Sequence, residues 1–187
     1  MIKKVLIATS LAITVMFSGC STISGTYKLE NGAIGAYWDM YTGVTEHGDP
    51  AKAMMKEFEV QEDVTNDDVA ESIHALAEEY NMRITGDIKM FNIENAKPDE
   101  VKHARIFSLC SLDIAKKFLN HSRYFGGFMP CRIMLVEYGN GKRYLITMDL
   151  KLAIYGGFPL PKEMKELAQK VETAMTEIPS RAAEGDF

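Results

Sequence analysis

The fold is decided by residues 104–150, which read ARIFSLCSLDIAKKFLNHSRYFGGFMPCRIMLVEYGNGKRYLITMDL. Apolar and polar side chains alternate over Ala104–Cys110, a pattern that predicts a strand. The apolar spacing then changes to that of a short helix over Leu112–Leu119, with Ser111 at the N-cap position. Cys110 and Cys131 bracket this helix, and we expect the rest of the chain to pack around the unit.

A hairpin is predicted after this helix. Gly126, Gly127 and Pro130 force the chain out of the helix, because glycine tolerates many backbone conformations and proline cannot continue a helical ladder. Two strands follow, Arg132–Tyr138 and Lys142–Met148. The Asn-Gly step between them is among the stronger sequence signals for a hairpin turn.

The preceding part of the chain predicts a strand, a helix and a second strand. Glu57–Gln61 and Arg83–Phe91 alternate as strands, and the helix between them begins at Thr65. A last helix follows Pro161, and we expect Pro179 to end it and Ser180–Phe187 to form a frayed tail.

This order of elements predicts an α+β fold with a mostly antiparallel sheet of about five strands and two to three helices packed on it. A ferredoxin-like arrangement fits the first six elements. The expected division is a signal peptide over 1–20, a tether and docking segment over 21–55, an α+β domain over 56–150, and a C-terminal helix and tail over 151–187. The aromatic run at 37–41 has two interpretations, a binding patch and an anchor that docks the tether onto the domain, and we favour the anchor because aromatic side chains bury large areas.

The N-terminus has the pattern of a secretory signal. Lys3 and Lys4 precede an apolar run, Val5–Phe17, which is too short to cross a bilayer as a mature helix. Residues 17–20, Phe-Ser-Gly-Cys, resemble the lipobox of bacterial lipoproteins, in which the cysteine carries the lipid. We therefore expect Cys20 to be the lipid attachment site. Ser21 resembles the sorting residue of lipoproteins sent to the outer membrane, where this domain would face the periplasm.

The composition indicates an acidic globular protein. The chain has 187 residues, 47% of them hydrophobic, and a net charge of −5 that becomes two units more negative when Lys3 and Lys4 leave with the signal peptide. A nucleic-acid partner is disfavoured, because binding phosphates requires a basic patch.

Residues from about Phe58 to Asp149 resemble the DUF302 family of small bacterial and archaeal domains. The most specific feature is residues 127–133, Gly-Phe-Met-Pro-Cys-Arg-Ile. The resemblance also includes the strand, helix and strand that end at Phe91, the strand residues 106–110, the short helix that contains Ala115, and Thr147-Met148-Asp149. Family members often have Asn-Pro after the first cysteine, where this chain has Ser111-Leu112. The resemblance implies an α+β fold and a homodimer, and it supplies no established activity.

Cys110 and Cys131 are left as an even pair in an oxidising compartment once Cys20 is assigned to lipid. One interpretation is a disulfide between two strands, which would stabilise the fold by about 3 kcal/mol. A second is a soft-metal site in which Met129 supports the thiols, as in Cu(I) proteins. A third is a redox or nucleophilic thiol, favoured by the helix that starts after Cys110 and by Arg132 beside Cys131. Pro130 completes this group of candidate residues.

No catalytic constellation is recognisable in the sequence. The cysteine and histidine spacings do not match zinc or haem motifs, and the paired glycines lack the lysine of a phosphate-binding loop, so we expect no cofactor and no resident metal. The leading hypothesis is a non-enzymatic envelope module that binds a small ligand or another envelope protein. The alternative is a thiol-redox or copper-type protein that uses Cys110 and Cys131.

Overall fold

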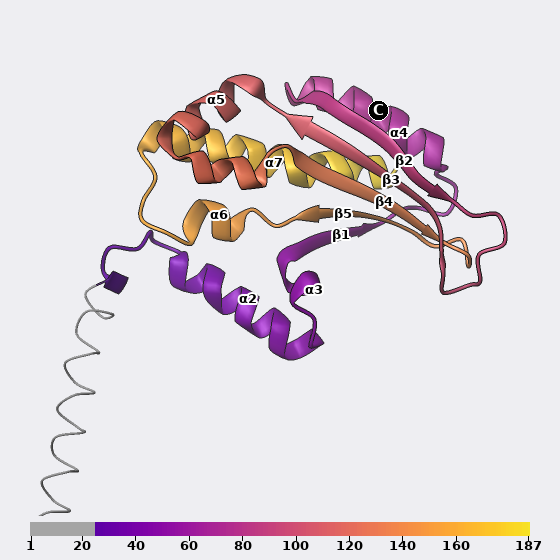
Figure 1. Ribbon diagram of the computed structural model, residues 1–187, viewed down its shortest axis with the longest axis horizontal. Helices are drawn as coiled ribbons and strands as arrows, with labels where there is room; N and C mark the ends of the chain where they lie inside the picture. Colours follow the sequence, from indigo (N-terminus) through magenta and orange to yellow (C-terminus); the bar gives the residue numbers. More distant parts are fainter. Residues whose placement is uncertain (1–24) are drawn as a thin grey trace, which may run out of the picture.

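The computed structural model describes residues 25–187, so the predicted signal peptide and Cys20 lie outside the described residues. Five strands form one sheet in the order β1-β5-β4-β3-β2 (Figure 1). Every neighbouring pair is antiparallel, which confirms the predicted sheet. The strands are β1 (Met55–Glu59), β2 (Arg83–Asn92), β3 (Val101–Cys110), β4 (Cys131–Tyr138) and β5 (Arg143–Met148).

The strand order differs from the ferredoxin-like expectation. Strands β2 to β5 form one meander, and β1 joins its free edge by pairing with β5, with Phe58 opposite Leu145. In a ferredoxin-like sheet β1 would lie between two other strands. The hairpin of β4 and β5 occupies that neighbourhood here, so α4 (Asn66–Glu79) carries the chain from one edge of the sheet to the other.

Helices α4 and α7 (Lys162–Ala183) pack on one face of the sheet and bury the main core (Figure 1). Alternate strand residues point to that face because side chains alternate along a strand. Its fully buried side chains include Phe107, Leu109, Ile133, Leu135 and Leu145. The start of α4 is fixed as predicted, by a capping box in which Thr65 and Asp68 bond each other's backbone N–H groups.

The segment expected to be a tether contains a regular helix, α2 (Ala33–His47), followed by α3 (Pro50–Met54). Asp49 caps α3, because its side chain accepts hydrogen bonds from the backbone amides of Ala51 and Lys52. Within residues 37–41, the hydroxyl of Tyr37 donates to the carbonyl of Gly156 at 2.9 Å, so part of this run docks on the domain as expected and part of it faces solvent. Trp38 is 62% exposed, whereas the face of α2 that packs on the molecule is built from small residues such as Ala33 and Ala36.

The chain also forms more helices than expected within residues 25–187. In addition to α2 and α3, the helices that were not expected are a 3-10 helix η1 (Arg123–Phe128), where a turn was expected, and α6 (Lys151–Tyr155). Helix α5 (Leu112–His121) is the predicted short helix. Ser111 occupies the N-cap of α5 but makes no side-chain cap bond.

The C-terminal tail is ordered rather than frayed. Helix α7 continues through Pro179 to Ala183, and Pro179 itself is buried. Proline removes one helical hydrogen bond, but burial of the residues around it offsets that cost. The amide of Gln61 donates to the carbonyl of Ala183 at 2.9 Å, which ties the tail to the end of β1.

Candidate functional site

The candidate site lies where the chain passes from α5 through η1 into β4. Two glycines in η1 let the chain turn tightly, and Pro130 follows Met129 through a cis peptide bond before β4 begins. This path places Phe128 and Cys131 beside the end of β5. The conspicuous motif of the sequence therefore forms one wall of a pocket.

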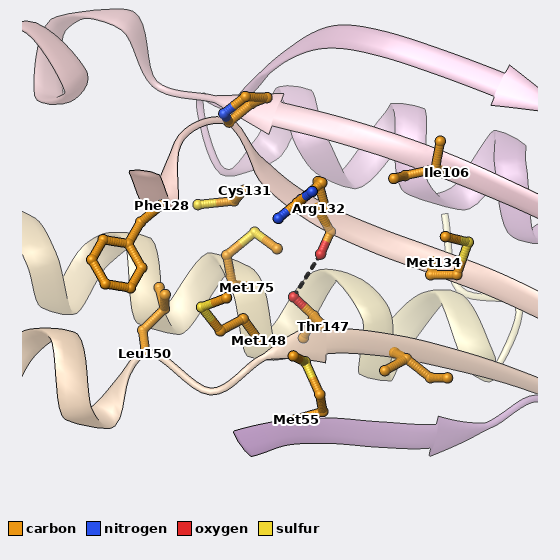
Figure 2. A pocket seen from close by; sticks show the side chains of 12 residues that line it. Met55, Ile106, Phe128, Cys131, Arg132, Met134, Thr147, Met148, Leu150 and Met175 are labelled. Atoms are coloured by element: carbon orange, nitrogen blue, oxygen red, sulfur yellow. Dashed lines mark hydrogen bonds between the residues drawn. The ribbon is translucent and has the colours of Figure 1, made fainter. Parts of the chain in front are cut away.

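The first pocket has a volume of about 200 Å³ and a mostly apolar lining. Figure 2 shows side chains from β1, β3, β4, β5 and α7 converging on it, with the sulfur ends of Cys131, Met148 and Met175 directed toward the same space. Its full lining is Met55, Ile106, Phe128, Pro130, Cys131, Arg132, Met134, Ile146, Thr147, Met148, Leu150 and Met175.

Two more hollows adjoin the first, and Phe128 is a wall of all three. The second, of about 80 Å³, is lined by Met129, Cys131 and side chains of α5, α6 and α7. The third, of about 220 Å³, lies between α2 and Met148. Phe128 is 42% exposed, so its ring separates these hollows without being locked in the core.

The polar groups of the first pocket lie at its wall and mouth. The hydroxyl of Thr147, which is nearly fully buried, donates to the carbonyl of Arg132 at 2.9 Å and so presents no unpaired polar atom to the cavity. Arg132 is the one charged side chain in the lining, and its guanidinium makes no ion pair among the described residues. The pocket is thus an apolar hollow with a free cation at its entrance.

The two thiols do not have the character of activated nucleophiles. Burial raises the pKa of Cys131 to about 11, and the nearby Cys110 adds to the shift, whereas Arg132 opposes it only weakly. Burial also raises the pKa of Cys110. The start of α5 was expected to favour a Cys110 thiolate, whereas loss of solvent at this position acts in the opposite direction.

Cys110 and Cys131 are free cysteines in the structure. The strand register pairs Cys131 with Leu109, one residue before Cys110, so the two cysteines are not direct cross-strand partners. A disulfide between them stays a prediction.

Most of the residues predicted from the motif come together at the pocket. Pro130, Cys131 and Arg132 line the first hollow and Met129 lines the second, whereas Cys110 lines neither. Sequence reasoning missed Phe128, Met148 and Met175 as site residues. Met148 lies in the Thr-Met-Asp step of the family resemblance, which was the available signal, but Met175 falls on an ordinary buried helical stripe.

A second polar cluster lies at the opposite end of β3. His103 is 92% buried and its Nε2 atom has no hydrogen-bond partner. Its cross-strand neighbour Glu137 accepts hydrogen bonds from Lys102 at 2.8 Å and from Asn66 at 2.5 Å. Burial alone would raise the pKa of Glu137, but these donors outweigh it and lower the pKa. Burial lowers the pKa of His103, against the opposing effect of Glu137.

Within residues 25–187, no three His, Cys, Asp or Glu side chains gather closely enough to hold a metal ion. No helix in that part of the chain is both long enough and apolar enough to cross a bilayer.

Comparison with known proteins identifies the fold and the family. The sequence model described as "Domain of unknown function DUF302" matches residues 57–180. A solved structure described as an uncharacterized conserved protein DUF302 from Bacillus stearothermophilus is similar, with a TM-score of 0.53 and 13% identity over 69% of this chain and 98% of that chain. A search of curated proteins found no match.

Proposed function

Because the chain belongs to the DUF302 family, whose function is undefined, we propose its role from its own pocket: a lipid-anchored module that binds a small apolar molecule carrying an anionic group. The observation that carries the proposal is the apolar hollow beside Phe128 with Arg132 at its mouth. Ligand sites in proteins are mostly apolar clefts with a few polar groups that fix orientation.

The size and charge of the pocket define the ligand class. A hollow of about 200 Å³ is smaller than the ~300–1,000 Å³ of typical ligand sites, so the molecule or its buried part is small. The apolar and methionine lining suits a flexible hydrocarbon, because methionine side chains adapt to irregular shapes. The unpaired guanidinium of Arg132 suits a carboxylate or another anion at the entrance.

The proposed location follows from the N-terminal sequence. Cys20 would carry the lipid, and the domain would face the periplasm from the outer membrane, as expected for a lipobox followed by Ser21. A lipid-anchored binding domain can act by holding its ligand near the membrane without transforming it. Apart from Arg132 at the mouth, Cys131 is the one titratable side chain that lines the pocket. Its raised pKa supports a non-enzymatic role, because a protonated thiol is a poor nucleophile.

The test uses the full-length lipidated protein in detergent and titrates it with carboxylates of six to twelve carbons and with their alcohols. We expect the carboxylates to bind and Arg132→Gln to reduce their affinity about tenfold, with little effect on the alcohols. Ile146→Glu, which places a charge in the hollow, should abolish binding of both. The matched control is Ile88→Glu, another isoleucine of the sheet, 58% exposed and outside the lining.

A different result would contradict the proposal. If Ile146→Glu binds these carboxylates as tightly as Ile88→Glu does, the pocket beside Phe128 is not the binding site. If no member of either series binds the folded wild-type protein, the proposed ligand class is wrong.

A second candidate function is soft-metal binding, and the observation that favours it is the convergence of Cys131, Met148 and Met175 on the first pocket. Thiolate and thioether sulfurs are the ligands that Cu(I) prefers. The site differs from the predicted one, because Met148 and Met175 replace Cys110 and Met129. Competition for Cu(I) against a chromogenic chelator tests it: Met148→Leu should weaken copper binding, whereas Met90→Leu on β2 should leave it unchanged.

A further inference from the structure

Helix α2 carries a stripe of one isoleucine and three aromatic side chains that faces solvent, called the aromatic stripe below. Ile34 is 73% exposed, Tyr37 48%, Trp38 62% and Tyr41 58%. Their spacing of three and four residues places all four on one side of the helix. The rings of Trp38 and Tyr41 lie 5.6 Å apart, so the stripe is a continuous surface.

The opposite side of α2 holds the helix firmly on the molecule. Ala33 and Ala36 are buried, and Gly43 packs against Ala53 of α3 so closely that an added Cβ would lie 3.0 Å from that side chain. At the edge of the stripe, the hydroxyl of Tyr37 also donates to the carbonyl of Gly156 at 2.9 Å, so the tip of this side chain is anchored to the molecule while its ring is half-exposed. The aromatic stripe is therefore presented outward by a helix that is fixed in place.

The charges on α2 are compatible with an interface between water and lipid. The four residues of the stripe are uncharged, and Asp39 on the flank is paired with Lys151. Trp and Tyr are the side chains enriched at the level of lipid headgroups, since their rings combine apolar area with a polar tip. A helix with one such face is typical of segments that lie in the plane of a membrane surface.

The length of the chain before α2 brings this face within reach of the anchor. Four residues lie between Cys20 and Gly25, the first described residue, and the five residue-to-residue steps from Cys20 to Gly25 span at most about 18 Å when the chain is extended. Figure 1 shows α2 at the periphery of the molecule, beside α3 and α6 and close to the point where the described chain begins. A domain tethered this closely keeps α2 beside the bilayer.

We propose that the stripe of Ile34, Tyr37, Trp38 and Tyr41 seats on the lipid surface in which Cys20 is anchored. This inference rests on the lipid attachment contained in the proposed function. Two of the residues on the buried side of α2, Ala36 and Met40, also line the third hollow. Seating α2 on the bilayer therefore places that hollow, which shares Phe128 with the ligand pocket, next to the membrane surface.

Trp38 is the single tryptophan of the chain and reports on this contact directly. The full-length lipidated protein is reconstituted into phosphatidylethanolamine and phosphatidylglycerol vesicles, some containing lipids brominated near the headgroup end of the acyl chain. We expect the emission of Trp38 to shift to shorter wavelength, to be quenched at least twofold by the brominated lipids, and to be shielded from aqueous acrylamide. Intact mass measured on the same sample confirms the acyl chains.

Variants test whether the stripe is responsible. Ile34→Ser combined with Tyr41→Ser keeps the fluorophore and should abolish most of the quenching by brominated lipid. The matched control is Tyr124→Ser, which removes a 75% exposed aromatic residue of η1 and should leave the quenching unchanged.

Two outcomes overturn the inference and remain distinguishable from each other. If the mass shows acyl chains while Trp38 stays fully accessible to acrylamide, the protein is anchored but α2 does not seat on lipid. If shielding depends on protein density and not on brominated lipid, the stripe contacts a second copy. An unacylated protein would instead refute the proposed anchor, on which the inference depends.

Discussion

At the scale of single residues, Phe128 sets the capacity of the pocket, because its ring is shared by three hollows. We expect Phe128→Ala to join them and shift the preferred ligand to longer chains. The ring is 42% exposed, so the loss of stability should be only about 1 kcal/mol. Carboxylate titrations and urea unfolding measure the two effects. Phe158→Ala, at a 63% exposed position, is the control, and an unchanged chain-length preference in Phe128→Ala would contradict the prediction.

The raised pKa of Cys131 predicts slow and strongly pH-dependent alkylation. Since the thiolate is the reactive form, the rate of modification by iodoacetamide should keep rising between pH 7 and pH 10, well below the pKa of about 11. The measurement is peptide mass analysis of Cys131 in Cys110→Ser, which excludes reaction at the neighbouring thiol. A rate that levels off below pH 9 would show that the thiol is activated and would revive the redox alternative.

The buried His103 should make the free energy of unfolding depend on pH. Its pKa in the folded state lies below the ordinary 6.5, so the unfolded chain binds a proton that the folded protein excludes. Stability is therefore greatest above pH 6.5 and falls as the pH decreases below that value. The free energy of unfolding of His103→Gln should depend less steeply on pH between pH 6.5 and pH 5 than that of the wild-type protein. The lowered pKa of Glu137 keeps its own contribution below this window. Equal slopes in His103→Gln and the wild-type protein would contradict the assignment.

Sequence reasoning found the contiguous part of the site and missed the part assembled by tertiary packing. Residues 129–132 could be predicted because they form one motif at the start of a strand. Met148 and Met175 could not, because the end of β5 and the middle of α7 meet only in the folded core. The direction of the Cys110 pKa also depended on burial, which the position before a helix does not reveal.

At the scale of elements, the end of α7 is expected to contribute to stability. Ala182 and Ala183 are buried, and Arg181 pairs with Glu79 of α4 at 2.8 Å. Deleting residues 181–187 should cost ~2–3 kcal/mol through lost burial and backbone hydrogen bonding. Chemical unfolding measures this loss, with deletion of the exposed Phe187 as control. Equal stability of the two shortened chains would show that the tail is frayed after all.

Strands could be predicted more completely than helices, for a physical reason. Alternation of side chains identified all five strands, but it does not state which edge accepts β1, so the ferredoxin-like order was wrong. Helix α2 was missed because its buried face is made of alanine and glycine, and its large side chains face solvent. A helix is usually recognised in a sequence by large apolar residues spaced along its buried face, and in α2 the large residues lie on the exposed face instead.

At the scale of the whole molecule, the apolar pocket and the polar cluster lie at opposite ends of the sheet. The apolar pocket lies at the end of β3 near Cys131, and the third hollow extends it toward α2. The polar cluster around His103 lies at the opposite end of β3. A lipid at Cys20 and a seated α2 would hold the pocket end near the bilayer, where apolar anions partition. The proposed ligand class and the proposed anchor thus support the same orientation.

The measurement that tests the central claim most directly is methyl NMR of the protein labelled at the methionine methyl groups, titrated with octanoate. The chain has 12 methionines, of which Met55, Met134, Met148 and Met175 line the pocket, whereas Met82 and Met90 line none of the three hollows. The account predicts saturable shifts of the Met148 and Met175 methyl signals, with Met90 unchanged, and their loss in Ile146→Glu. Shifts confined to Met82 and Met90, or no saturable shift in the folded protein, would contradict it.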